Sequence, residues 1–395
     1  PLRRPGLCFD SWVTPGMVDP YGPPPFMTTL VGAFSFQLLD PDRRESNTTP
    51  RTTRCAVIPT PEILNQWRIE GDVAPVADGG LINDTFAVGR PPRAILQRVN
   101  PIFGPEVHGD IDAITAHLAG HDGATPRLIR TTDGALCVPT DKGAWRLLTY
   151  LPGTTVHRIQ SPQQAASAAE LVGRFHRATQ DFEHTFAFVR PGAHDTVAHM
   201  HSLRTALDAS SGDPMEGPAC TIGREILQRW ETWSGSLDLP MRISHGDLKI
   251  SNLRFDESKT TARSLLDLDT LSHQSIAVEM GDAWRSWCNT AGEDNPEEAH
   301  FDLEIFEASA SSWLNHGPDL GDHERANLVA GIERICLELA ARFCADALNR
   351  SYFKEDRRRF PTAGEHNIHR ARGQLAVARS VHHQRLPAER IVQSR

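Results

Sequence analysis

The chain has 395 residues, of which 39% are hydrophobic and 23% are charged, and its formal net charge is −9. This composition is typical of a folded globular protein rather than a disordered chain, and the length allows two domains, because single hydrophobic cores stop growing at roughly 250–300 residues. The negative charge argues against nucleic-acid binding, since nucleic-acid-binding domains are usually basic on at least one face.

The seven cysteines are scattered and never spaced as Cys-x-x-Cys, which favours a reducing compartment and predicts a cytoplasmic location. The longest apolar stretch, residues 27–39, is interrupted by polar residues and is too short to cross a bilayer. We therefore expect no membrane span and no signal peptide. The sequence is compatible with either a monomer or a homodimer.

Residues 1–55 are rich in proline, glycine, threonine and arginine and show no sustained hydrophobic period, which predicts a disordered extension. Residues 56–151 contain short β-like runs separated by turn residues, which predicts a small, mainly β region. The candidate strands are residues 81–88, 93–99, 126–131, 135–140 and 145–151, and residues 110–120 form a candidate helix.

Residues 152–395 are predicted to be mainly helical. The first helix starts with Ser161 as its N-cap and Pro162 at its first position, and Gln164 is placed to complete a capping box. Strand character returns only around residues 243–271. The predicted fold class is therefore α+β, with a small, mainly β N-terminal lobe and a larger, mainly α C-terminal lobe. Further helices are predicted at 222–233 and 328–343.

The segment "ISHGDLKISNLRFD", residues 243–256, places polar side chains between apolar residues. Asp247 and Asn252 lie on a predicted loop, while Asp267 and Asp269 follow on a predicted strand, where alternate residues share a face. Two neighbouring carboxylates repel each other unless a cation lies between them, and carboxylate and amide oxygens suit Mg²⁺. The sequence therefore predicts a metal site that leaves one aspartate as a base, as phosphoryl transfer requires.

"HGDLKISN" followed by "LLDLDT" resembles the catalytic and metal motifs of the aminoglycoside phosphotransferase and choline kinase superfamily. The resemblance implies a bilobal protein-kinase-like fold that uses ATP and Mg²⁺. It implies that Asp247 is the catalytic base and that Asn252 and Asp267 bind the metal. His245 would brace the loop, and Lys249 would lie near the transferred phosphoryl group.

A narrower resemblance to N-acetylhexosamine 1-kinase-like proteins covers nearly all of residues 60–385. It is carried, in order, by "GGLINDTFAV", "AILQRVN", "WRLLTYLPG", "GRFHR", "HDT", "LLDLDTL", "GDAWR", "RFCADAL", "YF" and "HNIHRARGQLA". It implies ATP-dependent phosphorylation of a sugar at its anomeric hydroxyl. The sequence departs from that branch at Gly246, which is the residue of the wider superfamily. The candidate acceptor residues are His194, Asp195, Arg285, Arg342, Tyr352, His366 and Asn367, although Arg285 also fits a buried brace for a neighbouring aspartate.

Gly79 and Gly80 would let backbone N–H groups approach the nucleotide phosphates, next to Asn83 and Thr85 on the following strand. Where the protein-kinase-like fold normally has a lysine, the chain has Gln97 and Arg98. These neighbours face opposite ways on a strand, and the charge of Arg98 favours it as the phosphate ligand. Its acidic partner would be Asp110 or Asp112, and Thr149 to Leu151 would bind adenine through the backbone.

Three alternatives stay open. A kinase of an amino alcohol or an aminoglycoside would be favoured by an acidic, aromatic-rich acceptor cleft. A metal-dependent hydrolase would use His273 together with the histidine and aspartates of the two motifs and would depend on a transition metal. A nucleotide-binding pseudokinase is supported by the replaced lysine, but the presence of Asp247, Asn252 and Asp267 argues against it.

Overall fold

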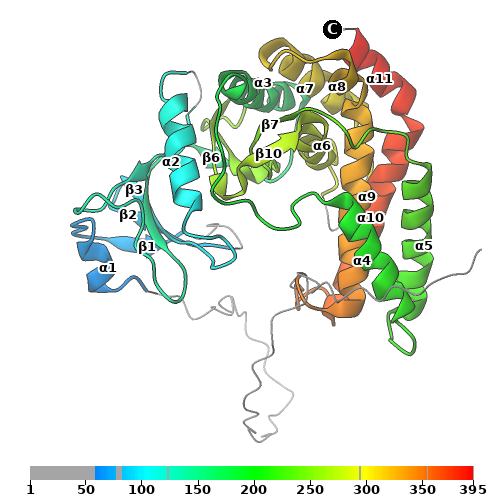
Figure 1. Cartoon of the computed structure of the whole chain (residues 1–395), viewed down its shortest axis with the longest axis horizontal. Coiled ribbons are helices and arrows are strands. Elements are labelled where there is room, and N and C mark those ends of the chain that lie inside the picture. Colours follow the sequence, from blue (N-terminus) through cyan, green and yellow to red (C-terminus); the bar gives the residue numbers. More distant parts are fainter. Residues whose placement is uncertain (1–57, 77–81, 122–123, 293–294, 354, 395) are drawn as a thin grey trace, which may run out of the picture. The chain divides into compact units, whose positions relative to one another are not determined.

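The computed structural model describes residues 58–76, 82–121, 124–292, 295–353 and 355–394, and all of them fall within one compact unit (Figure 1). The predicted disordered extension, residues 1–55, lies outside the described residues. Because the rest forms a single unit, the predicted division into 56–151 and 152–395 stays a prediction.

The N-terminal part contains a five-stranded antiparallel sheet in the order β1-β2-β3-β5-β4. Four predicted strands are therefore present, and the predicted helix is α2. The short helix α1 precedes the sheet. The bounds are α1 Pro61–Asn65, β1 Val73–Pro75, β2 Asp84–Val88, β3 Ala94–Arg98, α2 Val107–Leu118, β4 Leu128–Ile129 and β5 Trp145–Thr149.

The two faces of this sheet differ in character. Phe86, Leu96 and Trp145 are buried on one face and form a small apolar core with side chains from α1. Gln97 and Arg146 are paired in register between β3 and β5 and, with alternation along each strand, lie on the opposite face. The sheet thus has one apolar face and one face that carries polar groups.

The predicted strand at 135–140 is wrong. Within it, only Val138 pairs with a strand, through an isolated bridge to Trp145. Pro139 follows directly and has no N–H to donate to a ladder, which stops the pairing from continuing.

The C-terminal part is mainly helical, as predicted. The first long helix begins at its predicted cap, because the N–H of Gln164 donates to the Ser161 hydroxyl at 3.2 Å. The capping box is wrong: the Gln164 side-chain oxygen accepts the N–H of Gln160 at 2.8 Å instead. The bounds are α3 Pro162–Thr179, α4 Thr196–Asp208, α5 Glu216–Thr232, α6 Ile276–Trp287, α7 Leu303–His316, α8 Asp322–Ala326, α9 Leu328–Asn349, α10 Ala363–His383 and α11 Arg385–Gln393.

Helix α9 extends beyond the predicted 328–343 and is buried along nearly its whole length between α6, α4 and α10 (Figure 1). Its crossing with α6 depends on a glycine. A Cβ atom at Gly331 would lie 2.0 Å from the carbonyl oxygen of Ala277, so any larger residue would force the helices apart. This close crossing fixes α6 against the core of the helical part.

Two small antiparallel sheets lie among the helices, with orders β6-β8-β9 and β10-β7. The predicted strand that carries Asp267 and Asp269 is wrong beyond Leu265. Asp267 adopts a left-handed conformation with φ of 62°, and residues 268–270 form a 3₁₀ turn, η2, so Asp267 and Asp269 do not share a strand face. The bounds are β6 Thr154–Thr155, β7 Met241–Ser244, η1 Ile250–Asn252, β8 Leu253–Phe255, β9 Ala262–Leu265, η2 Leu268–Thr270 and β10 Ser272–Ser275.

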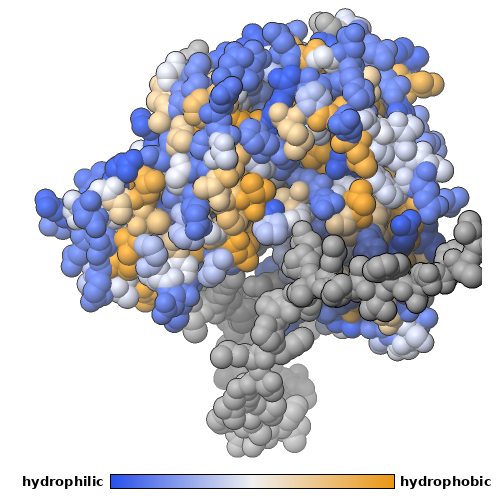
Figure 2. Space-filling model, viewed as in Figure 1, coloured by the Kyte–Doolittle hydropathy of each residue, from blue (hydrophilic) through white to orange (hydrophobic). Residues whose placement is uncertain are grey.

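In the part of the chain that the structure describes, none of the helices has both the length and the apolar character of a membrane span. Figure 2 shows hydrophobic residues in several small groups between hydrophilic ones on one face of the molecule. Exposed large apolar side chains include Ile102, Val189 and Met241. Such scattered residues are normal on folded proteins and need no partner to explain them.

Candidate active site

The loop after β7 carries the predicted catalytic residues. Asp247 receives two side-chain donors at the same oxygen, Oδ2: the Lys249 ammonium forms an ion pair with it, and the Asn252 amide donates to it at 3.0 Å. Asn252 also donates to the Asp247 carbonyl at 2.8 Å. Desolvation acts to raise the pKa of Asp247, but Lys249, His245 and Asn252 outweigh it and hold the pKa below its usual value. Asp247 is therefore an ionised carboxylate.

His245 joins the catalytic loop to the segment that carries Asp267. Its Nε2 lies 2.7 Å from the carbonyl oxygen of Leu266, and the Thr270 hydroxyl donates to the His245 carbonyl at 2.8 Å. Gly246 between them has a φ of +79°, and a Cβ atom there would lie 2.4 Å from the Thr270 carbonyl oxygen. The two loops are thus packed so closely that only glycine fits at this position.

Asp267 is exposed and makes no hydrogen bond or ion pair with any of the described residues. Protein atoms nevertheless crowd its carboxylate and limit its hydration. This desolvation, with repulsion from Asp269 and Asp247, raises the pKa of Asp267 to about 6. A bound cation would relieve that repulsion.

Asp269 was predicted as a metal ligand, but the structure gives its oxygens other partners. Arg146 forms a two-pronged ion pair with the Asp269 carboxylate, with one contact at 3.0 Å, and Asn83 donates to it at 2.7 Å. The Arg146 and Asp269 side chains are only 3% and 1% exposed. Asp269 therefore joins the N-terminal sheet to the catalytic region instead of facing a metal.

The polar face of the N-terminal sheet presents Gln97, not the preferred Arg98. Gln97 accepts two hydrogen bonds from Arg146, at 3.0 and 2.8 Å, and donates to the Thr85 hydroxyl at 3.1 Å. Arg98 lies on the other face and pairs with Asp84 at 2.6 Å. The choice of Arg98 is therefore wrong, because the register of the sheet turns it away.

Neither predicted acidic partner on α2 reaches a phosphate-binding cation. Asp110 accepts the N–H groups of Ala187 and Phe188, each at 3.0 Å, and Asp112 pairs with Arg130 at 2.6 Å. The α2 residue near the sheet arginine is His108. Its buried Nε2 has no partner among the described residues, and desolvation and Arg146 lower its pKa.

The remaining predicted nucleotide residues are placed as follows. Asn83 lies beside Asp269 and also accepts the N–H of Asn100 at 2.9 Å. The Thr149 N–H donates to the Arg127 carbonyl at 2.9 Å, and Leu151 lies two residues beyond the end of β5. Gly79 and Gly80 lie outside the described residues.

On the predicted acceptor side, His194 forms an ion pair with Glu338, with 3.3 Å between Nδ1 and Oε1. Asp282 pairs with Arg285 at 2.8 Å, as the alternative reading of Arg285 predicted. The Asp282 carboxylate contributes to raising the pKa of both Lys249 and His194, so these side chains share one neighbourhood. Asp282 therefore has an arginine as its partner, and Glu338 has His194.

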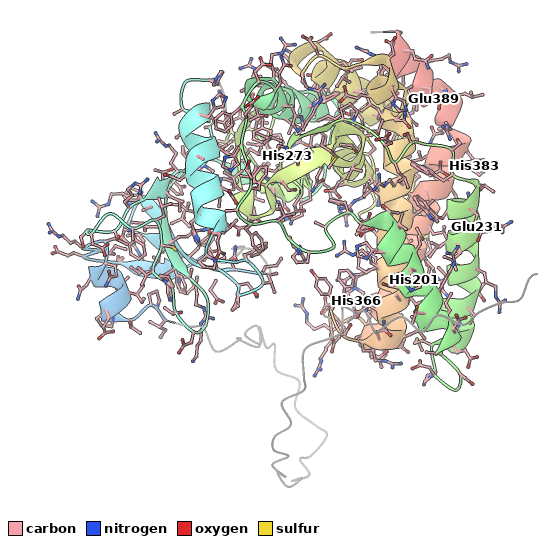
Figure 3. All side chains as sticks on the ribbon, viewed as in Figure 1. His201, Glu231, His273, His366, His383 and Glu389 are labelled. Carbon is pink, nitrogen blue, oxygen red and sulfur yellow. The ribbon has the colours of Figure 1, made fainter. Side chains whose placement is uncertain are left out.

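Other predicted acceptor residues have local structural partners. Asp195 caps α4 by accepting the N–H of Ala198 at 3.0 Å, and Asn367 donates to Asp346 at 3.0 Å. His366 stacks on Phe360 and lies at the start of α10, away from β7 and β10 (Figure 3).

Tyr352 differs from this group because it is 52% exposed. The Arg342 guanidinium lies 5.9 Å from the centre of the Tyr352 ring. Arg342 also acts to lower the pKa of His194, so it borders the acceptor neighbourhood. Among the predicted acceptor residues, Arg342 thus adds a positive charge at the border of the acceptor neighbourhood.

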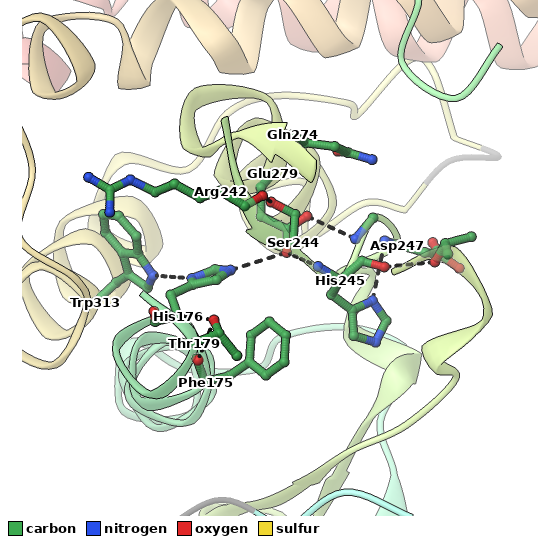
Figure 4. Close-up of polar contacts among 12 residues, drawn as sticks. Phe175, His176, Thr179, Arg242, Ser244, His245, Asp247, Gln274, Glu279 and Trp313 are labelled. Carbon is green, nitrogen blue, oxygen red and sulfur yellow. Dashed lines mark hydrogen bonds and ion pairs between the residues drawn. The ribbon is translucent and has the colours of Figure 1, made fainter. Parts of the chain in front are cut away.

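Two residues at the site were missed by the sequence analysis. Arg146 lies in the apolar strand segment "WRLLTYL", and Glu279 lies in the apolar helix start "IAVEM". A charge within such a run needs a buried partner, which is the signal that would have identified both. Glu279 accepts the N–H groups of His245 at 2.7 Å and Gly246 at 3.0 Å (Figure 4).

The residues present fit a Mg²⁺ ion. Asn252 donates through its amide nitrogen to Asp247, which leaves its oxygen free of partners among the described residues, and Asp267 has an unpaired carboxylate. Mg²⁺ is commonly held by only one or two protein oxygens together with phosphates and water. Asn252 and Asp267 are the two that would hold it.

Glu338→Gln is expected to change how stability depends on pH. Desolvation opposes ionisation of Glu338, but His194 outweighs it and lowers the pKa from 4.5 to about 2, while Glu338 raises the pKa of His194 above 6.5. The Glu338 contribution is therefore lost as pH falls from 4.5 towards 2, and that of His194 is lost as pH rises through its raised pKa. The free energy of unfolding of the parent should exceed that of the variant most between pH 4.5 and 6.5, and the Glu338 pKa shift corresponds to about 3 kcal/mol.

Urea unfolding between pH 3 and 8 measures this difference. Glu225→Gln is the matched control, because the pKa of Glu225 is also lowered to about 2, by Arg379 first, but at a partly exposed site. Salt should weaken the Glu225 effect and leave the Glu338 effect nearly unchanged. Parallel pH profiles for the parent and Glu338→Gln would contradict the predicted pair.

Comparison with known proteins gives consistent matches. The model of a family described as "Phosphotransferase enzyme family" (APH) matches residues 72–314. A homoserine kinase from Xanthobacter autotrophicus (strain ATCC BAA-1158 / Py2) is 24% identical over 172 residues, which are 44% of this chain and 50% of that protein. The chain thus spans about half the length of this curated relative.

Two solved structures show similarity over most of the chain. A microcompartment-associated aminopropanol kinase has a TM-score of 0.58 at 16% identity, covering 83% of this chain and 97% of that chain. An amicoumacin kinase in complex with AMP-PNP, Ca²⁺ and Ami has a TM-score of 0.53 at 14% identity, covering 78% and 91%. These similarities confirm the predicted α+β fold of the protein-kinase-like type.

Proposed function

Because the chain belongs to the phosphotransferase enzyme family, we propose that it transfers the γ-phosphoryl group of ATP, with Mg²⁺, to a hydroxyl group of a small molecule. The proposed acceptor is a sugar of the N-acetylhexosamine type, phosphorylated at its anomeric hydroxyl. The contact between Asp247 and Asn252, with Asp267 nearby, supports the reaction class.

In the proposed reaction, Asp247 is the base. Lys249 and Asn252 bind its Oδ2, so Oδ1 is free of partners among the described residues and can orient the acceptor hydroxyl. The oxygen of the acceptor hydroxyl bonds to the γ-phosphorus while the bond from that phosphorus to the leaving ADP oxygen breaks. Asp247 accepts the proton of the hydroxyl in the same step. Bound Mg²⁺ would neutralise phosphate charge. The protein contributes mainly by positioning these groups and by electrostatics.

The pairing of charges on the acceptor side is the observation that favours a sugar as the acceptor. Asp247 pairs with Lys249, Asp282 with Arg285, and Glu338 with His194, so none of these carboxylates is left for an ammonium group. Arg342 adds a further cation at the edge of this neighbourhood. An uncharged polyhydroxy acceptor suits this environment better than an amino alcohol, because a second cation would be repelled.

A kinase of an amino alcohol is the second candidate. It is favoured by the similarity to proteins named homoserine kinase and aminopropanol kinase. The paired acids described above argue against it.

The other two alternatives have less support. The contact between Asp247 and Asn252, with the Asp267 carboxylate near enough to be repelled by that of Asp247, argues against a pseudokinase. For the hydrolase, His273 contacts the carbonyl oxygen of His184, and the described residues contain no group of three or more His, Cys, Asp or Glu that could hold a metal.

The proposal is tested by ADP release from ATP and Mg²⁺ with a panel of N-acetylhexosamines, other sugars, choline, homoserine, aminopropanol and aminoglycosides. Asp247→Asn serves as the blank. We expect release with a sugar that is lost in the variant, and phosphorus NMR of the product should identify an anomeric phosphate. Release with an amino alcohol alone would overturn the sugar assignment, and ATP binding without release for any acceptor would favour the pseudokinase.

A further inference from the structure

A buried chain of hydrogen bonds runs from α7 through α3 and α6 to the catalytic loop (Figure 4). The Trp313 indole N–H donates to His176 Nδ1 at 3.1 Å, and His176 Nε2 lies 3.2 Å from Glu279 Oε1. Glu279 in turn accepts the N–H groups of His245 and Gly246. The three side chains are almost completely buried. Four elements that are distant in sequence therefore converge behind the catalytic aspartate.

The donor and acceptor properties of these groups determine where each hydrogen lies in this series of hydrogen bonds. An indole N–H can only donate, so His176 Nδ1 must be the unprotonated acceptor. The hydrogen of the neutral imidazole is then on Nε2 and donates to Glu279. The indole N–H therefore selects the tautomer of His176 that carries its hydrogen on Nε2.

Glu279 must be an ionised carboxylate. All three groups that face it are N–H donors, two from the loop backbone and one from His176. Desolvation acts to raise its pKa, but His176, His245 and Gly246 outweigh it and hold the pKa below its usual value. Without the His176 donor, one oxygen of a buried carboxylate would lose a partner, which is costly.

We infer that His176 and Trp313 are positioning residues for the phosphoryl transfer proposed above, and that they act on Asp247 through Glu279 and the His245–Gly246 backbone. The inference rests on the proposed function. Asp247 follows this peptide directly, and its own N–H donates to His245 Nδ1 at 3.3 Å. A rotation of the peptide would therefore change the direction of the catalytic carboxylate without removing any contact to substrate.

The protein contains a matched control for a substitution of Trp313. Trp284 is fully buried and packs edge-to-face against Trp313, with 5.9 Å between ring centres, but its indole nitrogen has no partner among the described residues. Trp313→Phe and Trp284→Phe thus make the same change in the same cluster. Only the first removes a hydrogen bond of the chain. Any difference between the two variants therefore reports the loss of the hydrogen bond from Trp313 to His176 rather than a general loosening of the core.

The first measurement is hydrogen exchange of the His245 and Gly246 amides in the full chain, which needs no acceptor. We expect exchange about tenfold faster in Trp313→Phe than in Trp284→Phe, because the weakened Glu279 contact eases local opening. The ¹⁵N spectrum of His176 should also change from a single Nε2–H tautomer in the parent to a mixture in Trp313→Phe. Equal exchange in both variants would overturn the inference.

The second measurement is steady-state kinetics with the acceptor found by the panel. Trp313→Phe should lower kcat about tenfold with KM for ATP unchanged, whereas Trp284→Phe should retain the parent kcat. If Trp313→Phe does not fold, His176→Gln and His176→Leu replace it, because the amide of glutamine can donate to Glu279 and accept from Trp313 while leucine can do neither. Equal kcat in the two His176 variants would overturn the inference, whereas a parent without any activity would instead refute the proposed function.

Discussion

Asp247→Asn should lower kcat by about 10²–10⁴-fold, the range in which general bases contribute, while ATP affinity stays within about twofold. The amide can still accept from Lys249 and Asn252, so the loop should keep its shape. It cannot take the proton of the acceptor hydroxyl. Lys249 loses an ionic partner, but its side chain is 41% exposed, and water can solvate it at little cost. Single-turnover kinetics with saturating ATP and acceptor measure this effect directly.

Asp238→Asn is a suitable control, because Asp238 is an exposed aspartate outside the site. It should leave kcat unchanged. A kcat for Asp247→Asn within tenfold of the parent would refute the assignment of Asp247 as the base.

Arg146→Met should lower the free energy of unfolding by about 3–5 kcal/mol, the cost of leaving one partner of a buried ion pair. The variant would leave Asp269 as a buried carboxylate whose remaining hydrogen-bond donor, among the described residues, is the Asn83 amide at 2.7 Å. Gln97 would also lose both of its hydrogen bonds from the guanidinium. Urea unfolding measures the difference.

Arg98→Met is the matched control, since Arg98 lies next to Gln97 on the same strand and also pairs with an aspartate. Its side chain is 17% exposed and that of Asp84 is 23% exposed, so the expected loss is only about 1 kcal/mol. Arg146→Met combined with Asp269→Leu should recover much of the lost stability, because no charge is then left unpaired. Equal losses for the two arginine variants would contradict the central role of Arg146.

Short-range spacing predicted that Asp247 and Asn252 lie close together. Asp247 and Asn252 are five residues apart, and the 3₁₀ turn at residues 250–252 brings the amide back to the carboxylate, so their proximity follows from local geometry. The same reasoning failed at Asp267, where alternation along a strand was assumed. The left-handed conformation of Asp267 ends that alternation. Aspartate adopts this conformation only occasionally, so the residue type alone does not predict it.

Contacts between residues that are distant in the chain could not be predicted from the sequence. Whether Gln97 or Arg98 faces the site depends on the register between β3 and β5, which is set by packing against Phe86 and Trp145. Asn367 shows the same limit in another way. It has a polar side chain in a matching motif, but its amide donates to Asp346 within the helical part.

The ion pair between Arg146 and Asp269 joins residues that are 123 positions apart in the chain. On a ribosome that adds 5–20 residues per second, about 6–25 s would pass between the synthesis of the arginine and that of its partner. During that time the nascent N-terminal sheet would carry a cation on its inner face with only Gln97 to receive it. The carboxylate partner of Arg146 is therefore supplied to the sheet only after the residues between them have been synthesised.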